Sequence, residues 1–144
     1  MTPKENKMSK YKKGLTDCGP CCGAYILDEP IKSPKLKTVY IASPYTIGDV
    51  GVNVRRQHSA YAKLMDAGFV PYAPLAISHY QHIIYPRHYE KWMVQDFQWI
   101  PICDIFLRLP GKSSGADREE ALARKLKKPI YHSIKILIKE EANK

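Results

Sequence analysis

The chain has 144 residues, 44% of them hydrophobic, which is enough for one domain with a buried core and too little for two ordinary domains. No apolar run approaches the roughly 18–20 residues that span a bilayer, and no signal-peptide-like hydrophobic segment follows the basic first residues, so we expect a cytoplasmic protein. The net charge of +9 lies at the two ends, because residues 1–37 hold eight lysines and four acids and residues 124–144 hold seven basic residues and two acids.

Residues 1–36 are rich in lysine and proline and have no clear periodicity, so we expect a basic extension that is partly ordered at best. Basic ends serve either as solvated tails or to attract phosphorylated ligands or nucleic acid. Because the chain carries no nucleic-acid-binding motif, we do not expect nucleic acid or a membrane to be a partner.

Three of the four cysteines, Cys18, Cys21 and Cys22, lie in this extension. Cys18 and Cys21 have the spacing of a thioredoxin-type redox pair, but the strand before them and the long helix after them that this motif requires are missing. No nearby Cys/His pair completes a zinc site. We therefore predict loop thiols without a redox or metal role.

Strand and helix patterns then alternate. Residues 37–44 are a short β-rich run that ends at a proline, which is typical of a buried strand. Residues 52–68 carry apolar side chains at helical spacing and end in a glycine, which predicts a helix. Residues 69–74 predict a second strand, whereas residues 75–88 are aromatic and irregular and indicate a loop.

The second half continues the alternation. The segments are a helix at 89–103 that Pro101 ends, a strand at 104–110, a helix at 117–128, a strand at 129–133, and a final strand or short amphipathic helix at 134–144. Alternating strands and helices predict a parallel sheet that is covered on both faces. Ligands bind beyond the carboxyl ends of such strands, so we expect the segments SPYT, APLAISH and LPGKSSGA to meet at one crevice.

The segment LPGKSSGADREEA at residues 109–121 has two interpretations, a phosphate-binding loop or a loop that presents a carboxylate. A P-loop requires a glycine where the chain has Phe106, and the Rossmann glycine pattern is also absent, so we exclude both motifs. A strand, a turn of small residues and a helix N-terminus remain. The free N–H groups and partial positive charge of such an N-terminus can hold an anion.

Two carboxylates are candidates for chemistry near this turn. Glu119 lies in or near the first helical turn, so we expect it to be anionic at neutral pH, and Asp96 of the preceding helix is expected near the same edge of the sheet. Two carboxylates in different environments can cleave a glycosidic bond, one by attack and one by protonating the leaving group. Acidic residues in a first turn also serve as ordinary partners of the helix dipole, so the pattern alone leaves both roles open.

At these residues the chain resembles the nucleoside 2-deoxyribosyltransferase superfamily, and within it most closely the branch of (deoxy)nucleoside 5'-monophosphate N-glycosidases. The shared segments are KTVYIASPY, DFQWIPICDIFLRLPG and SSGADREEALARKLKKPIY, within about residues 37–133. The resemblance implies a flavodoxin- or Rossmann-like three-layer α/β domain over residues 37–144, with a parallel sheet of four or five strands. It also implies a homodimer or higher homo-oligomer and no metal or other cofactor.

The resemblance also implies roles for individual residues. Glu119 corresponds to the nucleophile that attacks C1' of the sugar, Asp96 to the acid that protonates the departing base, and Tyr40 to a tyrosine that orients the nucleophile. Ser113 corresponds to a serine near a 5'-phosphate, where the transferase branch has an aspartate that would repel phosphate. The further substrate contacts that it implies are Ser43, Tyr45, Gly115, His79 and Arg55.

We therefore expect an enzyme that cleaves the base–sugar bond of a (deoxy)nucleoside 5'-monophosphate through Glu119. The alternatives are a nucleoside 2-deoxyribosyltransferase that exchanges bases and a non-catalytic nucleotide-binding module. A phosphoribohydrolase of the cytokinin-activating type is a further alternative, although LPGKSSGADREE lacks the second adjacent glycine and the threonine of that pattern. The base and the need for a deoxy sugar do not follow from the sequence.

Overall fold

The computed structural model describes residues 12–13, 25–26 and 35–142, and the chain divides into two units at Lys35. In the first unit, the described residues form two short strands, β1 (Lys12–Lys13) and β2 (Tyr25–Ile26), which pair antiparallel. The cysteines considered above as a redox or metal site lie outside the described residues: Cys18, Cys21 and Cys22.

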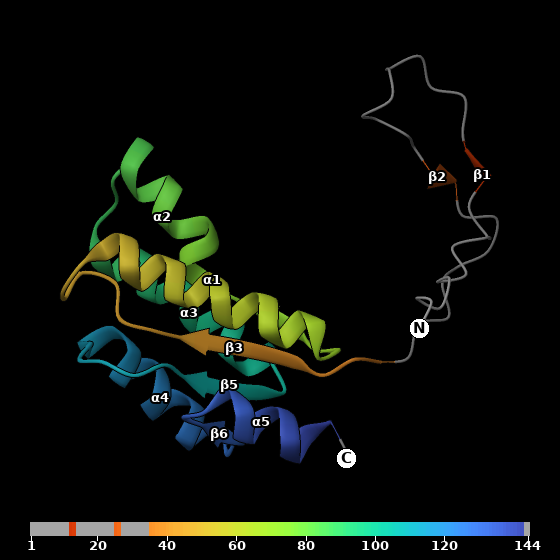
Figure 1. The fold of residues 1–144 in the computed structure, drawn as a ribbon. Helices are drawn as coiled ribbons and strands as arrows, with labels where there is room; N and C mark the ends of the chain where they lie inside the picture. Colours follow the sequence, from red (N-terminus) through yellow and green to blue (C-terminus); the bar gives the residue numbers. More distant parts are fainter. Residues whose placement is uncertain (1–11, 14–24, 27–34, 143–144) are drawn as a thin grey trace. The chain divides into compact units, whose positions relative to one another are not determined.

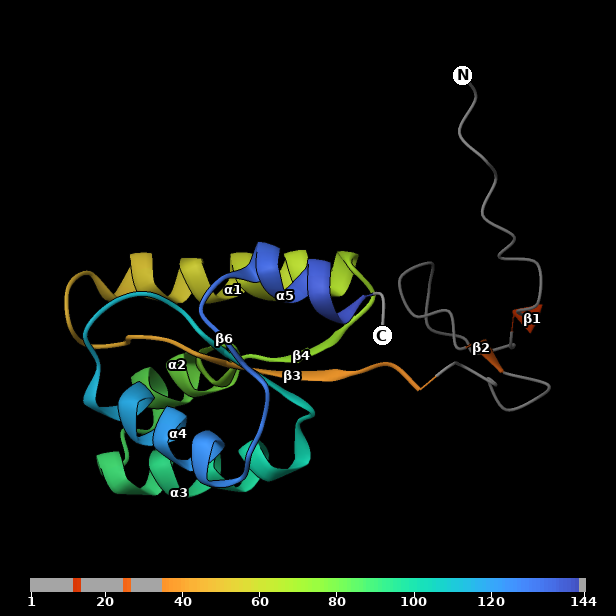
Figure 2. The ribbon, with the colours of Figure 1, turned by 90° about the horizontal axis from the view of Figure 1, so that it is seen from below.

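The second unit is a parallel sheet between two layers of helices (Figure 1). Its elements are β3 (Thr38–Ala42), α1 (Val50–Asp66), β4 (Val70–Tyr72), α2 (Pro74–Ile84), α3 (Tyr89–Ile102), β5 (Ile105–Arg108), α4 (Ser114–Lys125), β6 (Ile130–Tyr131) and α5 (Ile134–Glu141). The strands, in the order β4–β3–β5–β6, all pair parallel to their neighbours, and Figure 2 shows α1 and α5 on one side of the sheet and α3 and α4 on the other. A three-layer α/β fold with a parallel sheet of four or five strands was predicted, and the structure confirms it with four.

The central strand β3 is buried on both faces. Val39 and Ile41 pack into the core beneath α1 and α5, whereas Tyr40 and Ala42 pack into the core beside α3 and α4. Side chains alternate between the faces of a strand, so a strand that is covered on both sides has to be apolar at every position. This requirement explains why β3 was recognisable from its sequence.

Helix α1 supports both the core and the loops beyond the sheet. Asp49 caps its N-terminus by accepting a hydrogen bond from the Val52 amide at 2.8 Å, and Gly68, with a φ of 87°, follows its end. One face of the helix is buried and changes character along its length. Ala60 and Leu64 extend the apolar core, and two side-chain amides nearer the N-terminus donate hydrogen bonds to backbone carbonyls of β3 and of the loop after it. These amides are Asn53 and Gln57.

The structure corrects the prediction for residues 75–88. This segment was expected to be a loop, but helix α2 occupies Pro74–Ile84, with the proline in its first turn, where a missing N–H costs nothing. Only Pro74 and Leu75 of this helix are buried, and several of its apolar side chains are exposed. The segment therefore has no amphipathic pattern from which a helix could be recognised.

Other helix boundaries also differ from the predictions. Helix α3 continues past Pro101 to Ile102, because the hydrogen bond and the close packing that a proline disturbs concern only the last turn when it lies at the helix end. Helix α4 begins at Ser114, earlier than expected, because Ser113 caps it. The last segment was expected to be a strand or a short amphipathic helix, and it forms the helix α5.

Candidate active site

A cavity of about 250 Å³ lies at the carboxyl ends of the strands. It is lined by residues from all three segments that were expected to meet, including Ser43 after β3, Ser78 in α2 and Ser113 before α4. Helix α3 forms a further wall through Trp92, Met93 and Asp96. The cavity therefore lies where a parallel α/β sheet usually binds its ligands.

Glu119 and Asp96 form a coupled pair of carboxyl groups in this cavity. Glu119, on α4, is 6% exposed, and its burial, followed by the charge of Asp96, raises its pKa from the ordinary value of 4.5 to about 8. Burial also raises the pKa of Asp96, on α3, to about 6, and its hydrogen bond with Glu119 offsets part of that effect. At neutral pH the pair therefore holds one proton and one negative charge.

The expectation that Glu119 is anionic at neutral pH is therefore wrong. Helix α4 begins at Ser114, which places Glu119 beyond the first turn, where the helix dipole has little effect. The removal of the carboxylate from water outweighs what remains of that effect.

Tyr40 lies close to this pair. Its ring is fully buried and stacks on Phe106, with the ring centroids 5.5 Å apart. Its hydroxyl has no hydrogen-bond partner among the described residues, yet it lies close enough to Glu119 to lower the pKa of that carboxyl. Burial, the charge of Glu119 and the charge of Asp96 raise the pKa of Tyr40 well above its ordinary value, so the phenol keeps its proton.

The other expected substrate contacts fall into two groups. Four of them line the cavity: Ser43, Tyr45, Ser113 and Gly115. The remaining two do not. His79 lies behind Tyr45, with its Nδ1 3.0 Å from the tyrosine hydroxyl, and Arg55 is exposed on α1 away from the cavity wall.

The start of α4 is built for close approach to α3. Ser113 caps the helix by accepting a hydrogen bond from the Ala116 amide at 3.2 Å. A Cβ at Gly115 would lie 2.9 Å from the Tyr89 hydroxyl, so a side chain there would displace that tyrosine. The glycine therefore lets the cavity wall formed by α3 pack against the first turn of α4.

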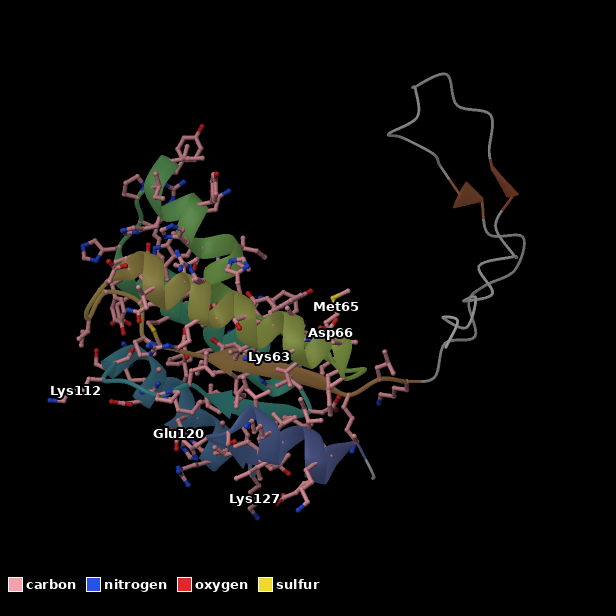
Figure 3. The ribbon with its side chains drawn as sticks, viewed as in Figure 1. Lys63, Met65, Asp66, Lys112, Glu120 and Lys127 are labelled. Carbon is pink, nitrogen blue, oxygen red and sulfur yellow. The ribbon has the colours of Figure 1, made fainter. Side chains whose placement is uncertain are left out.

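The adjacent side chains Glu119 and Glu120 face different surroundings. Glu120 pairs with Arg124 and lies 3.3 Å from His132 Nε2, outside the cavity lining. Figure 3 shows Glu120 on α4 and Lys112 extending away from the ribbon. Glu119 is therefore the glutamate that faces the cavity, and the Gly-Lys-Ser sequence does not direct its lysine into it.

Arg108 was not identified from the sequence. It ends β5 with a buried side chain that donates hydrogen bonds to the Leu109 carbonyl at 2.6 Å, to the Gly111 carbonyl at 3.0 Å and to Asp117 Oδ1 at 2.9 Å. It thus ties the loop after β5 to the first turn of α4. Its charge also lowers the pKa of Glu119. A basic residue at the end of an apolar strand was the only signal in the sequence.

The aromatic and basic wall of the cavity was also missed. It comes from α2, from the segment between α2 and α3, and from the start of α3, all at or near residues that were expected to form a loop. The side chains concerned are His82, Arg87, Tyr89 and Trp92.

Among residues 12–13, 25–26 and 35–142, no cluster of three or more histidine, cysteine or acidic side chains is arranged to hold a metal ion. Within the same residues, no helix combines the length and the apolar character that crossing a membrane requires. Cys103 is buried and unpaired, and burial raises the pKa of its thiol to about 11.

Comparison with known proteins gives one family. Residues 37–132 match the family described as "Domain of unknown function (DUF1937)". No curated protein matches the chain. Among solved structures, the chain is similar to a 2-deoxyribosyltransferase from the psychrotolerant bacterium Bacillus psychrosaccharolyticus, with 21% sequence identity and a TM-score of 0.48 over 65% of this chain and 69% of that chain.

Proposed function

The chain belongs to the DUF1937 family, and we propose that this member cleaves the N-glycosidic bond of a nucleoside or nucleoside 5'-monophosphate, with Glu119 as the nucleophile. The observation that carries the proposal is the placement of Glu119 and Asp96 in one cavity, where burial raises the pKa of both carboxyl groups. Two carboxyl groups in opposite protonation states are what glycosidic cleavage requires.

The first step needs the proton on Asp96 and the charge on Glu119. The hydrogen bond between the two groups provides a route for the proton to move onto Asp96. The Glu119 carboxylate then attacks C1', the C1'–N bond breaks with its electron pair leaving on the base, and Asp96 gives its proton to that base. A glycosyl ester of Glu119 and an ionised Asp96 result.

The second step restores the pair. Asp96, now a carboxylate, takes a proton from a water molecule, whose oxygen attacks C1' and releases the Glu119 carboxylate. The products are a free base and a free sugar or sugar phosphate, and the pair again holds one proton. The cycle requires no redox partner.

The contact between the two carboxyl groups favours this covalent route over direct attack by water. Enzymes that invert the sugar hold their two carboxyl groups about 6.5–9.5 Å apart, because a water molecule has to fit between one of them and the sugar. The pKa of each of these two carboxyl groups responds directly to the other, so they lie close together in the cavity. The proposal therefore predicts retention of configuration at C1'.

We assign Tyr40 a positioning role. Its buried hydroxyl has no hydrogen-bond partner among the residues that the structure describes, and it lowers the pKa of Glu119. A phenol in this place favours the ionised form of the carboxylate that attacks. Because its ring is stacked on Phe106, it can hold Glu119 without moving.

The cavity wall supports a nucleoside as the substrate. Tyr89, Trp92, Met93 and Leu75 offer an apolar surface that suits a planar base, and the two carboxyl groups suit the sugar. Ser113 is uncharged, whereas an acidic side chain in its place would repel a phosphate, and Arg87 adds a cation to the cavity lining. These two residues support a 5'-monophosphate over a nucleoside.

The same covalent intermediate also serves base exchange if a second base, rather than water, attacks C1'. We retain that activity as the alternative, since nothing in the carboxyl pair distinguishes the two acceptors. A module that only binds nucleotides has no need of a buried carboxyl pair, which is expensive to maintain in a fold.

The resemblance also leads us to propose that the protein forms a homo-oligomer. The exposed apolar side chains of α2 support this proposal, because association removes apolar surface from water. Those side chains are Ile77, Tyr80, Ile83 and Ile84. Sedimentation velocity of the full chain tests it, and a monomer at micromolar concentration would contradict it.

The function is tested with ribo- and deoxynucleosides and their 5'-monophosphates, each with and without an added free base. Base release is followed by chromatography for the wild type, for Glu119→Gln and for the control Glu120→Gln, whose side chain lies outside the cavity. We expect release by the wild type and the control, and none by Glu119→Gln. Release from monophosphates alone identifies a nucleotide hydrolase, and exchange of bases identifies a transferase. Near-normal turnover by Glu119→Gln would refute the proposal.

A further inference from the structure

The side chain of Gln57 connects three parts of the cavity wall. It lies on α1, is 1% exposed, and makes three hydrogen bonds. Its Nε2 donates to the Ile41 carbonyl at 2.9 Å and to Ser43 Oγ at 2.9 Å, and its Oε1 accepts from the Leu75 amide at 2.8 Å. One buried amide therefore joins the end of β3, the loop after it and the first turn of α2.

The backbone fixes the orientation of this amide. The Leu75 N–H can only donate, so the Gln57 atom that faces it has to be the oxygen. The Ile41 carbonyl can only accept, so the atom that faces it has to be the nitrogen. The two constraints agree, and both hydrogens of the NH₂ group are used, one on Ile41 and one on Ser43.

This orientation decides what Ser43 can do. Because Nε2 has no free lone pair, the Ser43 hydroxyl cannot donate to it and has to accept from it. The hydroxyl proton of Ser43 then needs an acceptor elsewhere. Within the described part of the chain it has none, and Ser43 lines the cavity.

A second serine of the cavity is arranged in the same way. Ser113 Oγ accepts from the Ala116 amide as the cap of α4, which leaves its own proton free. The loops that carry the two serines touch, since a Cβ at Gly111 would lie 2.7 Å from Pro44 Cγ. Two hydroxyl groups that can donate thus lie on adjoining loops. They make this part of the cavity wall polar, in contrast to the part formed by apolar side chains.

We infer that Ser43 donates a hydrogen bond to an oxygen of the sugar or of its 5'-substituent, and that Gln57 is the positioning residue that makes Ser43 a donor. This inference rests on the proposed function for the identity of the ligand, but the donor polarity of Ser43 does not depend on it. Oxygens that only accept, such as those of a phosphate, fit this part of the wall better than a hydroxyl does.

A measurement without ligand tests whether Gln57 donates to Ser43. In the wild type, both side-chain amide protons of Gln57 exchange slowly with solvent, because both are hydrogen-bonded in a buried site. In Ser43→Ala, one of them loses its partner, so nitrogen–proton NMR is expected to show faster exchange for that proton alone. Equal and rapid exchange of both protons in the wild type overturns the inference, whatever the enzyme acts on.

A binding measurement tests the ligand contact. Calorimetry is done in the Glu119→Gln background, which forms no covalent intermediate, with a nucleoside 5'-monophosphate, its nucleoside, the 5'-deoxynucleoside and the free base. Adding Ser43→Ala is expected to weaken the monophosphate about tenfold or more, and to weaken the nucleoside less. The free base is expected to bind unchanged. An equal loss for the free base overturns the assignment to the sugar end.

Gln57→Glu tests the positioning role. In this buried place the new side chain is a protonated carboxyl group: one oxygen still accepts from the Leu75 amide, and the other donates its single proton to the Ile41 carbonyl. That second oxygen has no proton left for Ser43, so it accepts from the Ser43 hydroxyl and turns that proton away from the cavity. We expect the same pattern of weakened binding as for Ser43→Ala, with no further loss when the two changes are combined. Ser59→Ala, on the exposed face of α1, is the control and is expected to bind like its parent. If the parent binds none of the ligands, the proposed function fails and the exchange measurement alone decides the polarity.

Discussion

Glu119→Gln is expected to stabilise the protein against unfolding, and increasingly so as the pH rises. The folded pKa of Glu119 is about 8, against an ordinary value of 4.5, so the folded chain holds a proton that the unfolded chain releases. Stability is therefore lost as the pH rises between these two values, and the glutamine variant, which has no proton to release, does not share that loss.

The size of this change in stability follows from the difference between the pKa of Glu119 in the folded chain and in the unfolded chain. Each pH unit between the folded and unfolded pKa corresponds to about 1.4 kcal/mol. The glutamate is nearly fully buried, so solvent screening reduces this free energy little. Its coupling to Asp96 divides the free energy between the two groups. We expect the variant to gain roughly 3 kcal/mol relative to the wild type between pH 5 and pH 8.

Urea unfolding at pH 5, 6, 7 and 8 measures this difference. The wild type, Glu119→Gln and the control Glu120→Gln are compared at each pH, and the free energies of unfolding are extrapolated to water. The curves of the wild type and the control are expected to fall together, while the curve of Glu119→Gln stays flatter. Parallel curves for the wild type and Glu119→Gln would show that Glu119 titrates normally, and the shared proton would have to be abandoned.

Three further results are expected. Turnover, followed as base release, is highest between about pH 6 and pH 8, where the carboxyl pair holds one proton, and it falls on both sides. Arg108→Met moves the alkaline limb of that profile to higher pH, because the charge that lowers the pKa of Glu119 is gone, whereas Arg108→Lys leaves the limb in place; equal shifts in both variants would contradict this. Gly115→Ala displaces Tyr89, which lines the cavity, and is expected to weaken nucleotide binding severalfold by calorimetry, with little change in melting temperature; unchanged binding would show that Tyr89 moves aside without affecting the ligand.

The secondary structure could be predicted from the sequence where the residues of one element are enough to determine it. A strand such as β3 must be apolar where both its faces are covered, and the residues Val39–Ala42 meet that requirement. Helix α2 was missed because most of its surface is exposed, so its residues carry no periodic pattern. A helix whose position is set by Pro74 and by the Gln57 contact to Leu75 cannot be read from local periodicity.

The same limit applies to the cavity. The spacing of acidic residues indicated Glu119 and Asp96, but their pKa values depend on burial and on their mutual distance, which only the packing of α3 against α4 determines. Arg108 illustrates the point further, because its three acceptors include two backbone carbonyls that the sequence cannot specify. The resemblance supplied roles for residues, and the fold supplied their protonation.

The edge strands of the sheet in the second unit are much shorter than its central strand. Its outermost strands, β4 and β6, have three and two residues, against five in the central strand β3. A border this short presents few unpaired N–H and C=O groups, so it is a poor template for the addition of a foreign strand and for fibril growth. The helix surfaces, and among them the exposed apolar side chains of α2 and α3, are then the faces through which copies of this unit would associate.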